Sequence, residues 1–137
     1  MKNCLVFDLD GTLVDTAPDL MMAHNHVMKK YGYSEMPVST IRKIAGRGAA
    51  SLLMESIDAQ GNLINKKNFD KKTHEKMTND FISYYRQNIS GHSKLRKNVV
   101  SLLDWCKEKE IVCAVCTNKK EDLAIKLLKE INIDKYF

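Results

Sequence analysis

The stretch that most constrains the fold of this chain is residues 4–13, with the sequence CLVFDLDGTL. Four apolar residues lead into two acids, Asp8 and Asp10, which are followed at once by Gly11 and Thr12. A short apolar run closed by a turn residue is typical of a strand buried on both faces of a parallel sheet. Ligands of open α/β sheets bind at the carboxyl ends of strands, so the sequence predicts two carboxylates at a ligand site.

A single Asp after a strand is more often a turn or N-cap residue than a functional one. Here Asp8 and Asp10 are two residues apart, follow a strand and precede Gly-Thr, and this combination favours a site. Because Asp is rarely buried without a partner, we expect a cation or a set of hydrogen-bond donors beside Asp8.

The composition indicates one modest globular core. The chain has 137 residues, of which 44% are hydrophobic and 28% charged, as in ordinary soluble domains. No apolar run approaches the length of a membrane span, and the N-terminal residues do not form a signal peptide. We therefore expect a cytoplasmic protein with no membrane partner.

The net charge of +5 is unevenly distributed along the chain. Residues 1–60 carry a net charge of −1 and residues 61–137 one of +6. A basic surface can serve nucleic acid or phosphorylated substrates. The lysines are interleaved with acids and lack base-stacking aromatic residues, so nucleic acid is not the expected partner.

Four cysteines, Cys4, Cys106, Cys113 and Cys116, occur without an export signal, which favours reduced thiols. Cys113 and Cys116 have the C-x-x-C spacing of some metal and redox sites. They lie in an expected strand, where residues three apart point to opposite faces. We therefore interpret them as core thiols.

A helix is expected after the opening strand, capped by Asp15 or Thr16 and ended by Gly32. Its apolar residues recur at helical spacing: they are Leu20, Ala23, Val27, Met28 and Tyr31. His24 and His26 are two positions apart and do not share a helix face, so the pattern does not predict a metal pair.

Residues 33–60 are typical of two short helices on either side of the turn Gly46-Arg47-Gly48. A loop over 61–66 and a long amphipathic helix from about residue 68 to 88 follow. Two interpretations of the turn remain open. It is either a plain connection with a solvated Arg47, or a means of presenting a cation to an anionic substrate.

The last part of the chain returns to an α/β pattern. A helix, a buried strand over 111–116 and a further helix follow one another closely. Strand, helical insert, helix, strand and helix is the order of a parallel α/β core interrupted by a helical domain. We assign residues 1–15 and 92–137 to the core and 16–91 to the insert.

Both expected strands end in polar residues, Asp8 and Asp10 on one and Thr117 and Asn118 on the other. Neighbouring parallel strands would bring these groups to one edge of the sheet. Carboxylates suit Mg²⁺, while a hydroxyl and an amide beside a helix N-terminus suit a phosphoryl group. A carboxylate nucleophile with a second acid nearby is consistent with phosphoryl transfer through an aspartyl-phosphate.

The segments Asp8-Leu-Asp10-Gly-Thr12 and Thr117-Asn118-Lys119 resemble the first two motifs of the haloacid dehalogenase-like hydrolases. The chain is identified as a C-terminally truncated member of this superfamily, in the phosphoglycolate phosphatase-like subgroup with a helical cap. The resemblance implies a Rossmann-like parallel-sheet core, here incomplete, with an inserted α-helical cap. It also implies a Mg²⁺-dependent phosphatase acting on a small phosphorylated metabolite such as 2-phosphoglycolate.

The resemblance also implies roles for individual residues. Asp8 would be the nucleophile and a Mg²⁺ ligand. Asp10 would be the general acid/base and would bind the metal through its backbone carbonyl. The remaining residues would shape the site or contact phosphate and substrate: Gly11, Thr12, Arg47, Thr117 and Asn118.

The sequence departs from the family pattern after the second motif. The family continues with a third-motif lysine and an acidic motif that completes the Mg²⁺ shell, whereas this sequence reaches Phe137 before either. The spacing of Lys119, Lys120 and Lys135 does not support any of them as a substitute. Leu95-Arg-Lys-Asn98 replaces the usual Pro-Gly entry to the helix after the cap.

Two alternatives follow from these departures. The chain is either an active phosphatase or an inert fragment or pseudoenzyme of the family. A related sugar-phosphate phosphatase or phosphomutase also fits the motifs.

With two core strands, the unfinished edge of the sheet is expected to be exposed and to favour self-association.

Overall fold

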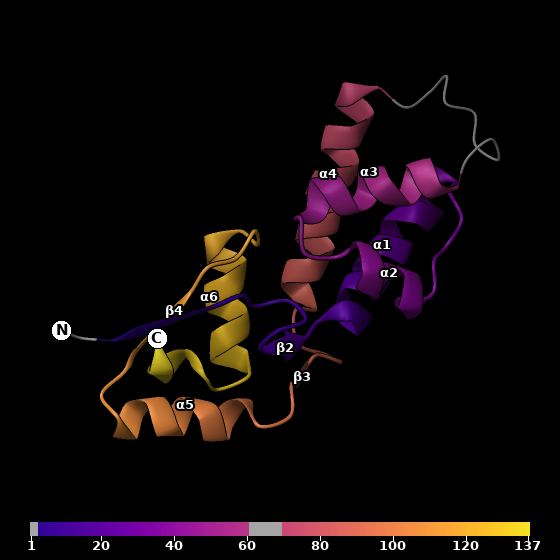
Figure 1. The fold of residues 1–137 in the computed structure, drawn as a ribbon. Coiled ribbons are helices and arrows are strands. Elements are labelled where there is room, and N and C mark those ends of the chain that lie inside the picture. Colours follow the sequence, from indigo (N-terminus) through magenta and orange to yellow (C-terminus); the bar gives the residue numbers. More distant parts are fainter. Residues whose placement is uncertain (1–2, 61–69) are drawn as a thin grey trace.

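The computed structural model describes residues 3–60 and 70–137 and shows a mixed α/β fold (Figure 1). The elements, in chain order, are β1 (Cys4–Phe7), β2 (Val14–Asp15), α1 (Ala17–Tyr31), α2 (Val38–Ile44), α3 (Ala49–Ala59), α4 (Lys71–Gln87), β3 (Lys94–Leu95), α5 (Val99–Glu108), β4 (Val112–Val115), α6 (Glu121–Glu130) and the 3₁₀ helix η3 (Asp134–Tyr136).

Strands β1 and β4 pair in parallel, as the sequence predicts. Their register runs from Cys4 opposite Val112 to Phe7 opposite Val115. The backbone N–H of Cys116 extends the pairing by donating to the carbonyl of Phe7 at 2.8 Å. The residues that follow the two strands therefore leave the sheet at the same edge.

A second, antiparallel pair joins the α/β part to the helical part. Val14 of β2 lies opposite Leu95 of β3, and Asp15 lies opposite Lys94. In Figure 1 this pair lies between the group α1–α4 and the group formed by β1, β4, α5 and α6. Two-residue strands carry no alternation of apolar and polar residues, so the sequence did not reveal them.

The predicted helices of the insert are confirmed where the structure describes them. Gly32 ends α1 with a left-handed φ of 76°. Helices α2 and α3 flank residues 46–48. Helix α4 begins after Asp70, whose carboxylate accepts a hydrogen bond from the N–H of Thr73 at 2.8 Å. The predicted loop over 61–66 lies outside the described residues.

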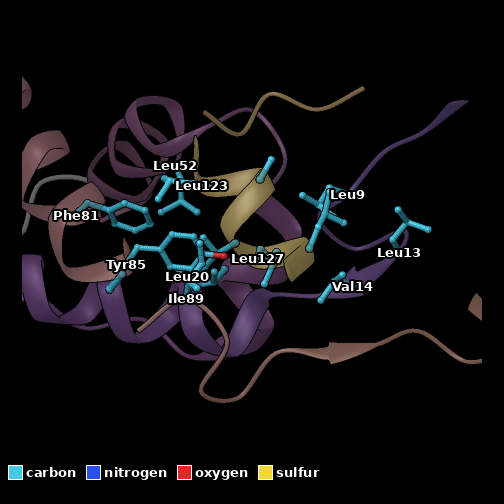
Figure 2. Close-up of a cluster of buried hydrophobic side chains, with 14 of the residues drawn as sticks. Leu9, Leu13, Val14, Leu20, Leu52, Phe81, Tyr85, Ile89, Leu123 and Leu127 are labelled. Carbon is cyan, nitrogen blue, oxygen red and sulfur yellow. The ribbon is translucent and has the colours of Figure 1, made fainter. Parts of the chain in front are cut away.

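One continuous cluster of buried side chains joins the two parts of the protein. Figure 2 shows that it includes Leu123 and Leu127 of α6 as well as Leu52, Phe81 and Tyr85 of the helical insert. Within the insert, α1 packs on α2 and α4, and α3 packs on α4 and α2. Of the apolar residues predicted for the helix after the opening strand, Leu20, Ala23, Val27 and Met28 are buried and Tyr31 is partly buried.

The expectation that the opening strand is buried on both faces is wrong for this structure. Val6 of β1 is 63% exposed, and Val112 of β4 is 49% exposed. Within the described residues the parallel sheet has two strands, so neither is flanked on both sides. This exposure agrees with the expectation of an open sheet edge.

The cysteines also differ partly from the prediction. Cys106 and Cys113 are buried free thiols, whereas Cys4 and Cys116 are exposed. The two cysteines of the C-x-x-C pattern thus differ in exposure, as expected for residues on opposite faces of a strand. The interpretation as a core thiol holds for Cys113, which is buried, and fails for Cys116, which is exposed just beyond the end of β4.

The entry to α5 uses an asparagine where the family pattern has Pro-Gly. Asn98 precedes the helix with a φ of 66°. Asparagine tolerates this left-handed conformation better than most residues other than glycine.

Among the described residues, no helix is both long and apolar enough to cross a membrane.

Candidate functional site

The parallel pairing of β1 and β4 places both predicted motifs at one edge of the sheet. Asp8 directly follows β1, and Thr117 follows β4 by two residues. The Asp8 side chain lies in an exposed position, and its Oδ1 accepts a hydrogen bond from the N–H of Leu9 at 2.7 Å. Asp8 is therefore accessible to a ligand from solvent.

Asp10 is held in a tight turn that folds the chain back toward β2. Gly11 adopts a φ of 80° and donates its N–H to the carbonyl of Val14 at 2.7 Å. Glycine suits this position because other residues rarely adopt a positive φ. Thr12 lies exposed in the same turn. The turn places the Asp10 carboxylate, 11% exposed, beside the start of α1.

The hydroxyl of Thr16 donates to Oδ1 of Asp10 at 2.6 Å. Thr16 is the N-cap residue of α1, but its side chain makes no capping hydrogen bond. The predicted capping role is therefore wrong for this side chain, whose oxygen accepts no hydrogen bond from the N–H groups of the first turn. Asp15 instead pairs with Arg42 at 2.7 Å.

Lys119 reaches Asp10 from the loop after β4. Its Nζ lies 3.1 Å from Oδ1 of Asp10, and its side chain is 5% exposed. The same Nζ donates to the hydroxyl of Tyr85 at 3.0 Å and lies 4.4 Å from the centre of the Tyr85 ring. Burial lowers the pKa of Lys119, although Asp10 and Asp8 act in the opposite direction.

Tyr85 lies on α4 and is almost wholly buried. Burial raises the pKa of its hydroxyl well above the usual range, and the negative charges of Asp10 and Asp19 contribute in the same direction. The tyrosine therefore stays neutral beside the ion pair of Asp10 and Lys119. Figure 2 shows its ring within the buried cluster, with Leu20 and Ile89 close by.

Thr117 and Asn118 shape the loop between β4 and α6. The hydroxyl of Thr117 accepts a hydrogen bond from the N–H of Lys119 at 3.1 Å. The amide of Asn118 donates to the carbonyl of Gly46 at 2.8 Å, which joins this loop to the turn between α2 and α3. Gly48 of this turn adopts a φ of 90°, a backbone conformation that favours glycine.

Arg47 lies at the rim of the site. Its side chain is 77% exposed, and Nη1 is 3.3 Å from Oε1 of Glu55. Arg47, Asp10 and Lys119 all line a cavity of about 260 Å³ between the turn at residues 46–48, α4 and the start of α6. The structure thus brings the predicted arginine to the same cavity as Asp10.

The described residues contain no group of three or more His, Cys, Asp or Glu side chains that could hold a metal ion. Asp8 and Asp10 supply two carboxylates. Mg²⁺ is often bound by one or two carboxylates together with waters and substrate phosphate, so this pair fits the metal. Thr16 and Lys119 both contact Oδ1 of Asp10, and neither contacts its backbone carbonyl, the atom through which the resemblance implies that Asp10 binds the metal.

Sequence reasoning missed the contact of Lys119 and Tyr85 with Asp10. Lys119 stands in the second motif, but its spacing gave no sign of where the side chain points. Tyr85 lies on the buried face of α4 with Met77 and Phe81, and such an apolar face by itself predicts only packing in the core. Its hydroxyl was the available signal, since a buried tyrosine usually finds a hydrogen-bond partner.

The chain belongs to the haloacid dehalogenase-like hydrolase family, whose sequence model matches residues 5–137. This result agrees with the parallel strand pair, the acid pair after β1 and the Thr-Asn-Lys loop after β4.

Within the family, the sequence is similar to phosphoglycolate phosphatases. It is 32% identical to the phosphoglycolate phosphatase of Agrobacterium fabrum over 132 residues, covering 96% of this chain and 54% of that protein. It is 34% identical to that of Caulobacter vibrioides over 133 residues, covering 97% and 54%. The chain therefore spans about half the length of these relatives.

The fold also resembles solved structures. A crystal structure described as a predicted phosphoglycolate phosphatase from Haemophilus somnus superposes with a TM-score of 0.87 and 28% identity, covering 99% of this chain and 60% of that one. A putative phosphoglycolate phosphatase from Lactobacillus delbrueckii also gives a TM-score of 0.87, at 20% identity, and shows the fold alone.

Proposed function

We propose that this protein is a Mg²⁺-dependent phosphatase that hydrolyses a small phosphomonoester, with 2-phosphoglycolate as the first substrate to test. The observation that carries the proposal is the convergence of Asp8, Asp10 and Thr117 at the carboxyl edge of β1 and β4. The similarity to phosphoglycolate phosphatases supports the choice of substrate.

The proposed reaction has two steps, each using the acid pair. A carboxylate oxygen of Asp8 attacks phosphorus, and the bond between phosphorus and the ester oxygen breaks as protonated Asp10 gives its proton to that oxygen. The Asp10 carboxylate then takes a proton from the water that attacks the aspartyl-phosphate. This second step releases phosphate and restores Asp8.

The other site residues would bind and orient the substrate. Thr117 and Asn118 would contact the phosphoryl group from the loop before α6, and Gly11 and Thr12 would shape the turn beside Asp8. Arg47 would pair with an anionic group on the substrate from the cavity rim. Asp8 and the Asp10 carbonyl would hold Mg²⁺, which neutralises charge on the transferring phosphoryl group when bound.

The test is Mg²⁺-dependent release of phosphate from 2-phosphoglycolate by the purified chain. We expect Asp8→Asn to reduce release to the background rate, because the amide is a poor nucleophile. Asp58→Asn is the matched control, since Asp58 is an exposed acid on α3. This control should retain the wild-type rate.

The outcomes of this assay distinguish the alternative functions that the sequence left open. No release above that of Asp8→Asn, with a folded wild-type chain, would support the inert-fragment alternative and contradict enzymatic activity. A preference for a sugar phosphate over 2-phosphoglycolate, still lost in Asp8→Asn, would support the related sugar-phosphate enzymes. A cytoplasmic location and a small phosphorylated metabolite as the partner remain part of this proposal.

A further inference from the structure

Lys119 occupies an unusual position for a lysine, because only 5% of its side chain is exposed. Lysine is almost never fully buried unless it is paired. Its two polar partners come from separate parts of the protein. Asp10 lies in the turn after β1, whereas Tyr85 lies on α4. The ammonium group therefore connects the acid pair to a helix of the insert.

The contacts at Asp10 fix one oxygen of its carboxylate. Thr16 donates to Oδ1 at 2.6 Å, and Nζ of Lys119 lies 3.1 Å from the same atom. Two donors arriving at one oxygen restrict rotation of the carboxylate. Neither of these contacts involves Oδ2, so the restricted group keeps an oxygen for proton transfer.

The contacts at Tyr85 fix the ammonium group in turn. The hydroxyl accepts a hydrogen bond from Nζ at 3.0 Å, and the ring centre lies 4.4 Å from Nζ. An ammonium over an aromatic face is attracted by the ring, and more strongly when water is excluded. Tyr85 is 1% exposed and stacks on Phe81 of the same helix. The position of Nζ thus depends on α4.

We propose that Lys119 is a positioning residue for the Asp10 carboxylate and makes its orientation depend on the placement of α4. The proposal rests on the proposed function in so far as Asp10 transfers protons. A displacement of about 1 Å in a reacting group can reduce turnover about 100-fold. Loss of Lys119 should therefore lower kcat much more than it changes KM.

The first experiment compares Lys119→Met, Lys119→Arg and Lys129→Met in the phosphate-release assay. We expect Lys119→Met to lower kcat about 100-fold with little change in KM. Lys119→Arg keeps a charged donor and should recover a large part of this loss. Lys129 is an exposed lysine near the end of α6, so Lys129→Met removes the same charge away from the site and should leave both constants unchanged.

Three results would overturn the positioning role. The first is a loss confined to KM, which would indicate substrate binding. The second is an equal loss in Lys129→Met, which would indicate a general effect of charge. The third is an Arg variant as impaired as the Met variant although both fold normally by circular dichroism.

The second experiment does not require activity. Urea unfolding is measured for Lys119→Met, Tyr85→Phe and the double variant, because contacting residues give non-additive effects. We expect the equilibrium constant for unfolding to increase in each variant relative to the wild type. The fold-increase in the double variant should be smaller than the product of the fold-increases in the two single variants. Additive effects would refute the connection to α4.

The two experiments also separate this inference from the proposed function. If the wild-type chain releases no phosphate, the proposed function fails, and a non-additive cycle still supports the connection between Lys119 and α4. If the wild-type chain is active and the cycle is additive, the proposed function stands and this inference fails.

Discussion

His24 lies wholly inside the helical insert and has a polar partner on one side of its ring. Nδ1 lies 2.8 Å from Oδ1 of Asn25, whereas Nε2 is buried with no hydrogen-bond partner in the described structure. Because the Asn25 oxygen is an acceptor, we infer that Nδ1 carries the proton of a neutral ring. Burial lowers the pKa of His24, and the contact with Asn25 offsets only part of this effect.

We therefore expect the free energy of unfolding to decrease as the pH falls through the ordinary histidine pKa of 6.5. Below that pH the unfolded chain takes up a proton that the folded protein excludes. The contribution of this one group is at most about 1.4 kcal/mol per pH unit. Above pH 7 the ring is neutral in both states, so the effect disappears.

Urea unfolding of the wild type and of His24→Leu, measured at several values between pH 5 and 8, checks this expectation. His24→Leu should have a smaller decrease in stability toward pH 5 than the wild type. His26→Gln is the matched control, since it removes an exposed imidazole from the same helix. Equal pH dependence in the wild type and His24→Leu would contradict the assignment.

At the level of elements, the start of α1 is joined to the segment before β3 by one buried carboxylate. Asp19 is 2% exposed. It accepts hydrogen bonds from the N–H groups of His92 and Ser93 and from the Ser93 hydroxyl, at distances between 2.6 and 3.0 Å. These bonds join the two chain crossings between the α/β part and the insert.

We expect Asp19→Ala to lower the free energy of unfolding by about 3 kcal/mol, because it leaves several donors without their acceptor. Asp19→Asn should cost less, since one side-chain oxygen remains. Asp58→Ala, an exposed change on α3, serves as the control and should alter stability by less than about 0.5 kcal/mol. Urea denaturation measures the free energy of unfolding of all three variants. If Asp19→Ala left this free energy unchanged, the buried carboxylate would not hold the two chain crossings together.

At the level of the whole molecule, the two-stranded parallel sheet exposes apolar side chains of both its strands. Leu5 and Val6 of β1 and Val112 of β4 are 38%, 63% and 49% exposed. Unpaired strand edges with apolar residues promote pairing between chains. The exposure of these strands supports the proposal that the chain self-associates through the sheet.

We expect light scattering to give an apparent mass that rises with concentration above the 15.7 kDa of one chain. Val6→Lys should reduce this rise by placing a charge on β1. Met54→Lys, at an exposed position on α3, is the control on another surface and should leave the rise unchanged. A monodisperse monomer at all concentrations would rule out association through the sheet.

Local patterns in the sequence predicted most of the helices and the parallel strand pair. Apolar residues at helical spacing and the glycines at the ends or between helices act within a few residues of each other, so they can be interpreted without a structure. The first and second motifs likewise identified the acid pair and the Thr-Asn loop. The two-residue strands, the exposure of β1 and the acceptor of the Thr16 hydroxyl were not predicted, because each depends on neighbours outside the local pattern.

The sequence by itself determined the α/β order of elements, the chemistry present at the ends of the two strands and membership of the hydrolase family. Only the tertiary structure showed that Lys119 and Tyr85, which are 34 positions apart, meet beside Asp10, or that Asn118 bonds to Gly46 across 72 positions. The physical reason is that such contacts arise when separate elements pack together. No periodicity within either segment encodes which distant side chain will lie opposite.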